Sequence, residues 1–184
     1  MEEMKDYSGP FRPDLKYEEF SKDFLIELMK VWQFFYLEMA SAWYDAVEKH
    51  ADYDTANECE REAWIRVVKR SLPRLVKTAN IELNTVLDSM KVMQLPPDNA
   101  VFMYPVEFEI KSKNHVIATI KKCSGLEYWE KHRPERIDAM CRGTALELDP
   151  MYAANPRVKG KALKLPPRES QDEPACVWEW KLEE

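Results

Sequence analysis

The cysteines are the residues with the most specific chemistry: Cys59, Cys123, Cys141 and Cys176. In the last predicted strand, alternation places Cys176 on the same face as Trp178 and Trp180. A thiol there could act as a nucleophile at the mouth of a pocket roofed by an indole ring. Buried cysteines more often only fill gaps in a core, so packing between the two indoles is the competing interpretation.

Two further cysteines lie beside predicted helices. Cys141 precedes Arg142 in a helical stretch, where a core position is favoured, and Cys123 directly precedes a predicted helix start, where a thiolate could feel the helix dipole. Cys123, Cys141 and Cys176 could together hold zinc or an iron–sulfur cluster. They are widely spaced and form no C-x-x-C pair, so a metal or cluster carrier is the least favoured class, and the cofactor stays unknown with none predicted.

A carboxylate and a histidine are candidates for acid–base work. Glu38 lies between Phe35 and Met39 in the most apolar part of the first helix, where a carboxylate could serve as a general acid or base. A solvated position at the helix rim is the favoured alternative, because acidic residues are seldom fully buried. His132 is the histidine nearest to Cys141 along the chain, so a Cys–His pair stays open.

Apolar periodicity predicts helices in the first half of the chain. Residues recur at three- and four-residue steps over 17–51, which predicts one long helix with an apolar middle that is covered on more than one side. Asp54-Thr55 with Glu58 resembles a capping box for a second helix that ends or kinks at Pro73. A third helix is predicted over 75–90, before Pro96-Pro97.

The pattern then changes to the alternation typical of strands. A β-hairpin is predicted over 102–110 and 116–120, and Ser124 with Glu127 predicts a capping box. A helix over 135–148 is expected to close at Asp149-Pro150. Two more strands are predicted over 158–165 and 175–182.

Because helices and strands are segregated along the chain, the predicted fold class is α+β, with N-terminal helical hairpins packed on an antiparallel sheet of about four strands. An N-terminal arm is expected at residues 1–16, followed by a single domain at 17–184. That domain divides into a helical layer at 17–95 and a sheet-containing part at 100–184.

Composition and charge limit the partners. The formal net charge of -6 and pI near 5.3 argue against binding nucleic acid or an anionic membrane. The N-terminus lacks the features of a secretory signal, so we expect a cytoplasmic protein with reduced thiols. It should fold alone or as a simple homo-oligomer, with a small molecule as its partner.

The closing segment resembles a known family. It consists of Cys141 near a helix, the linker Asn155-Pro156, a basic strand, an acidic loop and the run Cys176-Val177-Trp178-Glu179-Trp180. This order is similar to the end of the L-2-amino-thiazoline-4-carboxylic acid hydrolase-like family. An uncharacterised sister group resembles the chain more closely, through these features: Trp43 with Glu48, Trp64, Pro166-Pro167, Asp172 and the run Cys176 to Trp180.

The resemblance implies hydrolytic opening of a small nitrogen- or sulfur-containing ring. It points to Cys176 and Cys141 as candidate catalytic residues, and Glu38 and His132 join them from the residue types discussed above, near a predicted pocket between the helical layer and the sheet. The candidate substrate-binding residues are Trp178, Trp43, Tyr36 and Arg142. The alternative is a non-catalytic ligand-binding or accessory subunit whose aromatic pocket holds a planar compound.

Overall fold

The computed structural model describes residues 3–97 and 105–183. These residues form two compact units, 1–43 and 44–184, and the boundary falls inside the long helix α1 (Lys22–His50). The division into an arm at 1–16 and a single domain at 17–184 stays a prediction.

The first unit begins with a segment that folds back on the start of α1. The Met4 amide donates to the Glu19 carbonyl at 2.9 Å, and the Ser21 amide donates to the Met4 carbonyl at 2.8 Å. Between these contacts, Tyr7 meets Phe20 edge to face, and a single 3₁₀ turn spans Tyr17–Glu19. Backbone bonds and one aromatic pair therefore hold the segment before α1.

Helix α2 (Tyr53–Thr78) begins and ends elsewhere than predicted. Its N-cap is Asp52, whose side chain accepts from the Thr55 amide at 2.7 Å, so the predicted capping box of Asp54-Thr55 with Glu58 is wrong. Pro73 lies inside the helix and does not end it. The neighbouring Val68 and Leu72 are buried, and that packing offsets the backbone hydrogen bond that a proline removes.

The predicted helix over 75–90 is also wrong. The backbone takes a left-handed conformation at Asn80, with φ 51°, which stops helical continuation just after α2. A new helix, α3 (Val86–Met93), begins at a reciprocal capping box. In it the Asp88 amide donates to Thr85 Oγ1 at 3.3 Å, and the Thr85 amide donates to Asp88 Oδ2 at 3.0 Å.

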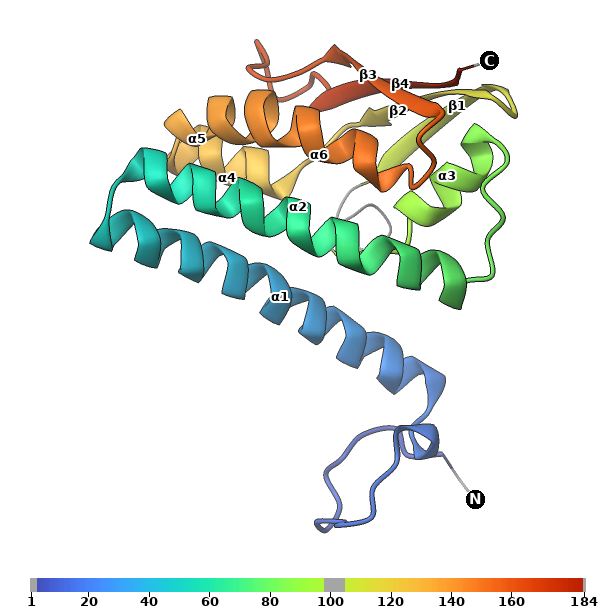
Figure 1. The fold of residues 1–184 in the computed structure, drawn as a ribbon. Coiled ribbons are helices and arrows are strands. Elements are labelled where there is room, and N and C mark those ends of the chain that lie inside the picture. The colour runs from blue at the N-terminus through green and yellow to red at the C-terminus, as the bar shows by residue number, and fades with distance from the viewer. Residues whose placement is uncertain (1–2, 98–104, 184) are drawn as a thin grey trace. The chain divides into compact units, whose positions relative to one another are not determined.

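The sheet has four antiparallel strands in the order β1-β2-β4-β3 (Figure 1). The predicted hairpin is present as β1 (Val106–Ser112) and β2 (His115–Ile120), and its early part at Phe102 and Tyr104 lies outside the described residues. The two late strands, β3 (Val158–Lys164) and β4 (Cys176–Leu182), match their predictions closely. Helices and strands are segregated, so the α+β fold class is confirmed.

A mostly helical segment that includes a π-helix connects β2 to β3. It contains α4 (Ser124–His132), α5 (Glu135–Ile137), a π-helix at Asp138–Thr144 labelled η2, and α6 (Ala145–Tyr152). The predicted closure at Asp149-Pro150 is wrong, because α6 runs on through Pro150. Tyr152 and Ala153 are buried in the core, and this packing holds the last turn in place.

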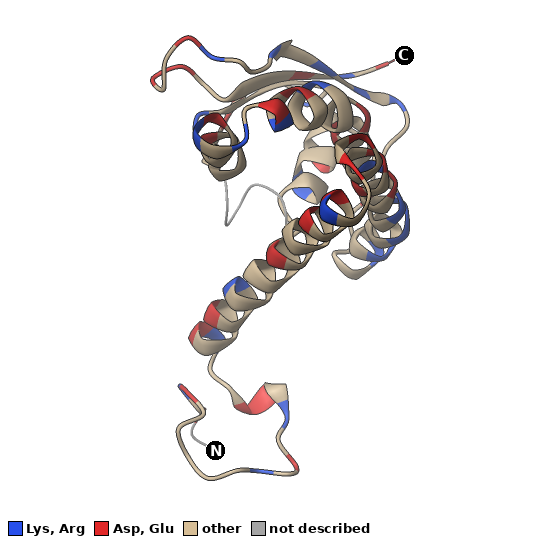
Figure 2. Cartoon of the chain, turned by 90° about the vertical axis from the view of Figure 1, so that its left-hand side faces the viewer, with Lys and Arg blue, Asp and Glu red and all other residues tan. Residues whose placement is uncertain are grey.

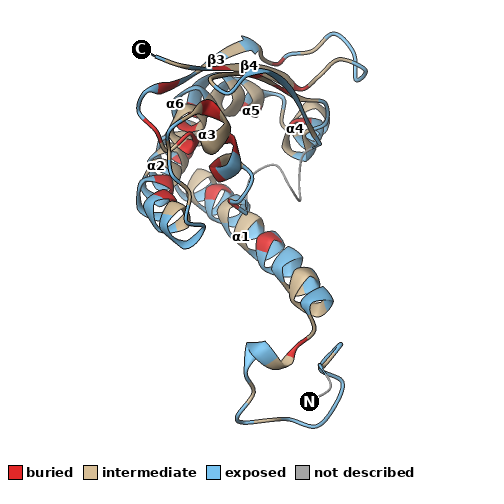
Figure 3. Ribbon diagram, turned by 90° about the vertical axis from the view of Figure 1, so that its right-hand side faces the viewer, coloured by how far each residue is buried: buried red, intermediate tan, exposed pale blue. Residues whose placement is uncertain are grey.

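The main core lies between the sheet and the helices on one of its faces (Figures 1 and 3). Trp178 and Trp180 of β4 are stacked there, with ring centroids 5.9 Å apart. Gly160 of β3 lies opposite Trp180, and a Cβ atom at that position would come within 2.5 Å of the indole ring. The strand pair thus requires a residue without a side chain at 160.

A buried ion pair joins the helices of the second unit. Arg136 donates to Glu60 at 2.7 Å, and its guanidinium lies 3.4 Å from the centroid of the Tyr44 ring. Burial raises the pKa of Glu60, although Arg136 opposes that rise. These contacts tie the last turns of α1 to α2 and α5. No described helix is long and apolar enough to cross a membrane.

Candidate functional site

Three cysteines from distant parts of the sequence lie within electrostatic range of one another. Cys123 is the N-cap of α4, Cys141 belongs to η2, and Cys176 is the first residue of β4. Negative charge on Cys123 raises the pKa of both other thiols, and Cys141 acts in the same way on Cys176. We call Cys123, Cys141 and Cys176 the thiol cluster.

Cys123 occupies the most polar position in the thiol cluster. Its sulfur accepts from the Leu126 amide at 3.4 Å, at the N-terminus of α4, so Cys123 takes the capping position predicted for Ser124. The helix dipole at this end favours a negative charge. Cys123, Cys141 and Cys176 are all partly buried, and Cys123 is set apart by the backbone donor at its sulfur.

The other two thiols are protonated at neutral pH. Burial is the largest cause that raises the pKa of Cys141 to about 12, followed by the charges of Cys123 and Asp149. Burial likewise raises the pKa of Cys176 to about 12, with Asp149 as the next contributor. A protonated thiol is a weak nucleophile but can donate a proton.

Trp178 has a buried indole N–H beside Cys176. Its Nε1 atom makes no hydrogen bond of ordinary geometry with any residue that the structure describes. The indole nevertheless acts on the thiol, because it lowers the pKa of Cys176 against the larger effect of burial. A buried N–H that makes no hydrogen bond of ordinary geometry is uncommon in folded proteins.

Arg168 and Glu130 form a two-pronged ion pair next to the thiol cluster. Arg168 Nε donates to Glu130 Oε1 at 2.8 Å, and Nη2 donates to Oε2 at 2.7 Å. These bonds raise the pKa of Arg168, and negative charge on Cys123 adds to the rise. The guanidinium therefore lies within electrostatic range of the Cys123 sulfur, and it fixes the loop before β4 to α4.

The π-helix is the local irregularity that carries Cys141. Such turns are rare and occur often at functional sites, because the extra residue in the turn changes where side chains point. Asp138–Thr144 adopts this geometry between α5 and α6. An apolar period of three or four residues does not reveal a π-turn, so the sequence predicted one continuous helix there.

Sequence analysis missed three residues of this site: Arg168, Glu130 and Asp149. Arg168 follows Pro166-Pro167 in a polar loop, and nothing in its local pattern shows that it becomes buried. Glu130 and Asp149 are charged residues on helices, which usually face solvent. The signal that could have found them is spatial, because each comes close to the thiol cluster only through the tertiary fold.

The other predicted site residues lie in different surroundings. Glu38 and Trp43 are exposed and, with Tyr36, belong to the first unit, so no distance relates them to the thiol cluster. His132 is exposed, and its ring lies 4.8 Å from that of Tyr128. Arg142 pairs with Asp138 at 3.3 Å. Catalytic or binding roles for these residues stay predictions.

Within the described part of the chain, no group of three or more His, Cys, Asp or Glu side chains is arranged to hold a metal ion. The three sulfur atoms of the thiol cluster are among the side chains that form no such group.

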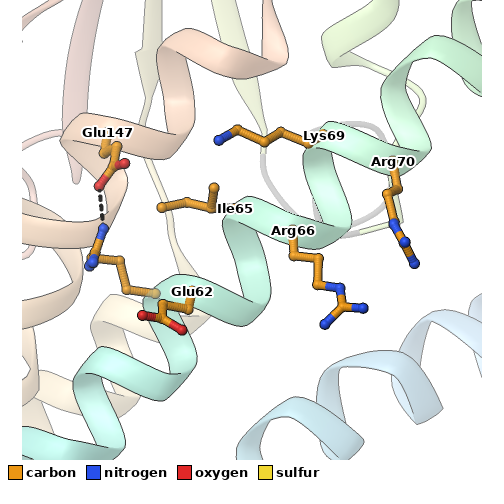
Figure 4. A pocket seen from close by; sticks show the side chains of 7 residues that line it. Glu62, Ile65, Arg66, Lys69, Arg70 and Glu147 are labelled. Atoms are coloured by element: carbon orange, nitrogen blue, oxygen red, sulfur yellow. Dashed lines mark hydrogen bonds and ion pairs between the residues drawn. The ribbon is translucent and has the colours of Figure 1, made fainter.

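Away from the thiol cluster, a hollow lies between α2 and α6, with a volume of about 550 Å³ (Figure 4). Glu147 pairs with Arg61 at its edge at 2.9 Å, and Lys69, Arg66 and Arg70 project from α2. Basic and acidic residues are interspersed along the helices (Figure 2). The hollow is wide open to solvent, and the cations diverge instead of pointing at one centre.

The fold and the site define an α+β protein with a three-thiol cluster beside a buried arginine–glutamate pair. The chain belongs to a family of unknown function (DUF6125), whose model matches residues 18–182. The matched range contains all of α1 and every residue of the thiol cluster. No curated protein and no solved structure matches the chain.

Proposed function

We propose that this protein is a small-molecule enzyme that opens a small nitrogen- or sulfur-containing ring by cysteine-dependent hydrolysis. The observation that carries the proposal is that the three neighbouring thiols lie in different environments. Cys123 accepts a backbone N–H at a helix N-terminus, whereas the pKa values of Cys141 and Cys176 are raised to about 12. One sulfur is thus suited to attack and its neighbours to proton donation.

The reaction follows from those roles. The Cys123 thiolate adds to the ring carbon, a C–S bond forms, and the C–N bond breaks with its electron pair left on nitrogen. That nitrogen takes the proton of a neighbouring thiol, Cys141 or Cys176. Water then adds to the carbon, its proton returns to that thiol, and the C–S bond breaks to release Cys123. One water is consumed and no redox partner is required.

Arg168 is a positioning residue in this proposal. Both of its outer nitrogen positions are engaged by Glu130 and by carbonyl groups of its own loop, so it does not reach the substrate freely. Its charge favours a thiolate at Cys123. The N–H of Trp178 offers a hydrogen bond to an atom that gains negative charge near Cys176.

The resemblance to the L-2-amino-thiazoline-4-carboxylic acid hydrolase-like family supports the same class of substrate. We also propose a cytoplasmic location, because reducing conditions keep thiols unpaired and all four cysteines are free. Of the sequence-predicted candidates, Cys141 and Cys176 take the role of proton donors and not that of the attacking sulfur.

A non-catalytic ligand-binding role is the second candidate. The raised pKa values of Cys141 and Cys176 favour it, because buried neutral thiols are typical of structural cysteines. In that case, the indole of Trp178 and the thiols would line a site for a planar compound. The two candidates differ in one respect: only the enzyme requires a reactive Cys123.

Turnover of a panel of thiazoline carboxylates and cyclic amides, followed by loss of ring absorbance, tests the proposal. Cys123→Ser should lower kcat by at least about a thousandfold, since a serine hydroxyl is a far weaker nucleophile without a base. The matched control is Cys59→Ser, which removes an exposed thiol on α2. If Cys123→Ser keeps full turnover of a substrate found in this way, the cysteine mechanism is refuted.

A further inference from the structure

Much of α1 is exposed to solvent (Figure 3), and several of its exposed residues are large and apolar. Trp32, Phe35, Met39 and Trp43 are 46%, 64%, 68% and 61% exposed, respectively. We define the α1 seam as Leu28, Trp32, Phe35, Met39 and Ala42. We propose that the α1 seam is the contact by which two copies of this chain pair.

The spacing of the seam is that of paired helices. Its residues follow one another at steps of four, three, four and three, which is the repeat of positions that meet a partner helix in a coiled coil. Val31 and Trp43 border it on either side. The seam contains no charged residue, so the same surface on two copies is self-complementary, as a twofold contact requires.

The area of the seam fits a dimer. Aromatic side chains offer about 150–250 Å² each, so at these exposures the seam with its borders presents roughly 600–700 Å² per copy. A standard interface buries about 800 Å² on each partner. Exposed apolar patches of this size are unusual on monomeric proteins. Helix pairing along the seam therefore accounts for nearly a whole interface.

Charge argues against a membrane as the occupant. Glu27 and Glu38 flank the seam on one side, and Lys30 beside them is already paired with Glu27 at 2.6 Å. Helices that lie on membranes carry lysine and arginine at their flanks, and the net charge of this chain is -6. Interfaces between permanent copies are the most apolar class of protein contact, which matches the seam.

Sedimentation equilibrium of the full chain over a range of concentrations tests the proposal. The expected mass is twice that of the 21.7 kDa chain. Phe35→Glu and Met39→Glu each place a charge in the seam and should weaken dimerisation at least a hundredfold. The matched control is Ser41→Glu, an exposed position on the same helix but away from the seam, which should leave the dimer unchanged.

Circular dichroism of each variant shows whether α1 still forms, and the substituted positions are exposed, so folding should persist. A wild-type chain that stays monomeric at micromolar concentration overturns the proposal, and so does a dimer that both seam variants leave intact. A monomeric wild type that binds anionic phosphatidylserine vesicles would assign the seam to a membrane instead and would also overturn it. None of these results depends on whether Cys123 is reactive.

Discussion

Two pairs of tryptophans lie in opposite environments. Trp178 and Trp180 of β4 are 3% and 1% exposed, whereas Trp32 and Trp43 of α1 are about half exposed. Both pairs belong to elements with a clear apolar face. The difference teaches that hydrophobic patterning identifies a face to be covered, while the tertiary structure decides whether one chain covers it.

The apolar face of the sheet is covered by residues of the same chain. Val116 and Ala118 of β2 lie opposite the two tryptophans, and Gly160 leaves space for the ring of Trp180. Among the described residues, by contrast, the aromatic side chains of the α1 seam are about half exposed or more. A second copy supplies the missing cover in the proposal above.

The largest expected effect separates these two pairs directly. Trp180→Ala should lower the free energy of unfolding by about 3–5 kcal/mol, because it leaves a cavity in the core. Trp32→Ala should cost less than about 1 kcal/mol when urea unfolding is measured at submicromolar concentration, where dimers dissociate. Equal losses would mean that Trp32 is buried within a single chain, and the contrast would be broken.

The ion pair at the base of α1 gives the next largest effect. Arg136→Met should destabilise the second unit by about 3 kcal/mol or more, because Glu60 would remain buried without its partner. The double variant Arg136→Met with Glu60→Gln should recover part of that loss. Urea unfolding followed by tryptophan fluorescence measures both. A single variant as stable as the wild type would show that Arg136 does not anchor α1 to α2.

Gly160 sharpens the account of the sheet core. Gly160→Ala should cost about 1–3 kcal/mol, since the added Cβ would overlap the indole of Trp180. Gly143→Ala is the matched control, because its nearest described atom outside the local helix is the Asp138 carbonyl oxygen at 3.7 Å. The control should be neutral or slightly stabilising. Similar losses for both variants would contradict close packing at position 160.

The smallest effect concerns helix capping. Thr85→Ala removes the acceptor of the Asp88 amide and should cost about 1 kcal/mol. Ser71→Ala is the control, because Ser71 is exposed in the interior of α2 and caps no helix end. Thermal unfolding by circular dichroism compares the two. An equal or larger loss for Ser71→Ala would contradict the role of Thr85 as the cap of α3.

Much of the fold could be predicted because period and segregation are local properties. Alternation identified β3 and β4 and the hairpin, and three- and four-residue steps identified α1. The boundaries failed where a single interaction decides: the left-handed Asn80, the capping residues Asp52 and Thr85, and Pro73 and Pro150 inside helices. At each of these positions the sequence is equally consistent with more than one helix boundary.

The site was less predictable because its members meet only in three dimensions. The sequence singled out the cysteines by type, and the structure brings Cys123, Cys141 and Cys176 within electrostatic range. The sequence could not rank the three thiols by reactivity, because that ranking depends on desolvation by the tertiary fold and on the hydrogen bond from the Leu126 amide. The Arg168–Glu130 pair joins a loop to a helix, and no sequence spacing indicates it.

The most direct test of the central claim, that the three clustered thiols differ in reactivity, is site-resolved iodoacetamide labelling of the folded chain at neutral pH, read by peptide mass spectrometry. Exposed Cys59 serves as the internal reference. Cys123 should label faster than Cys59, whereas Cys141 and Cys176 should label on the order of a hundredfold more slowly, because their pKa values are raised to about 12. Labelling of those two should accelerate as the pH rises towards 12. A Cys123 that labels no faster than Cys176 would contradict the account.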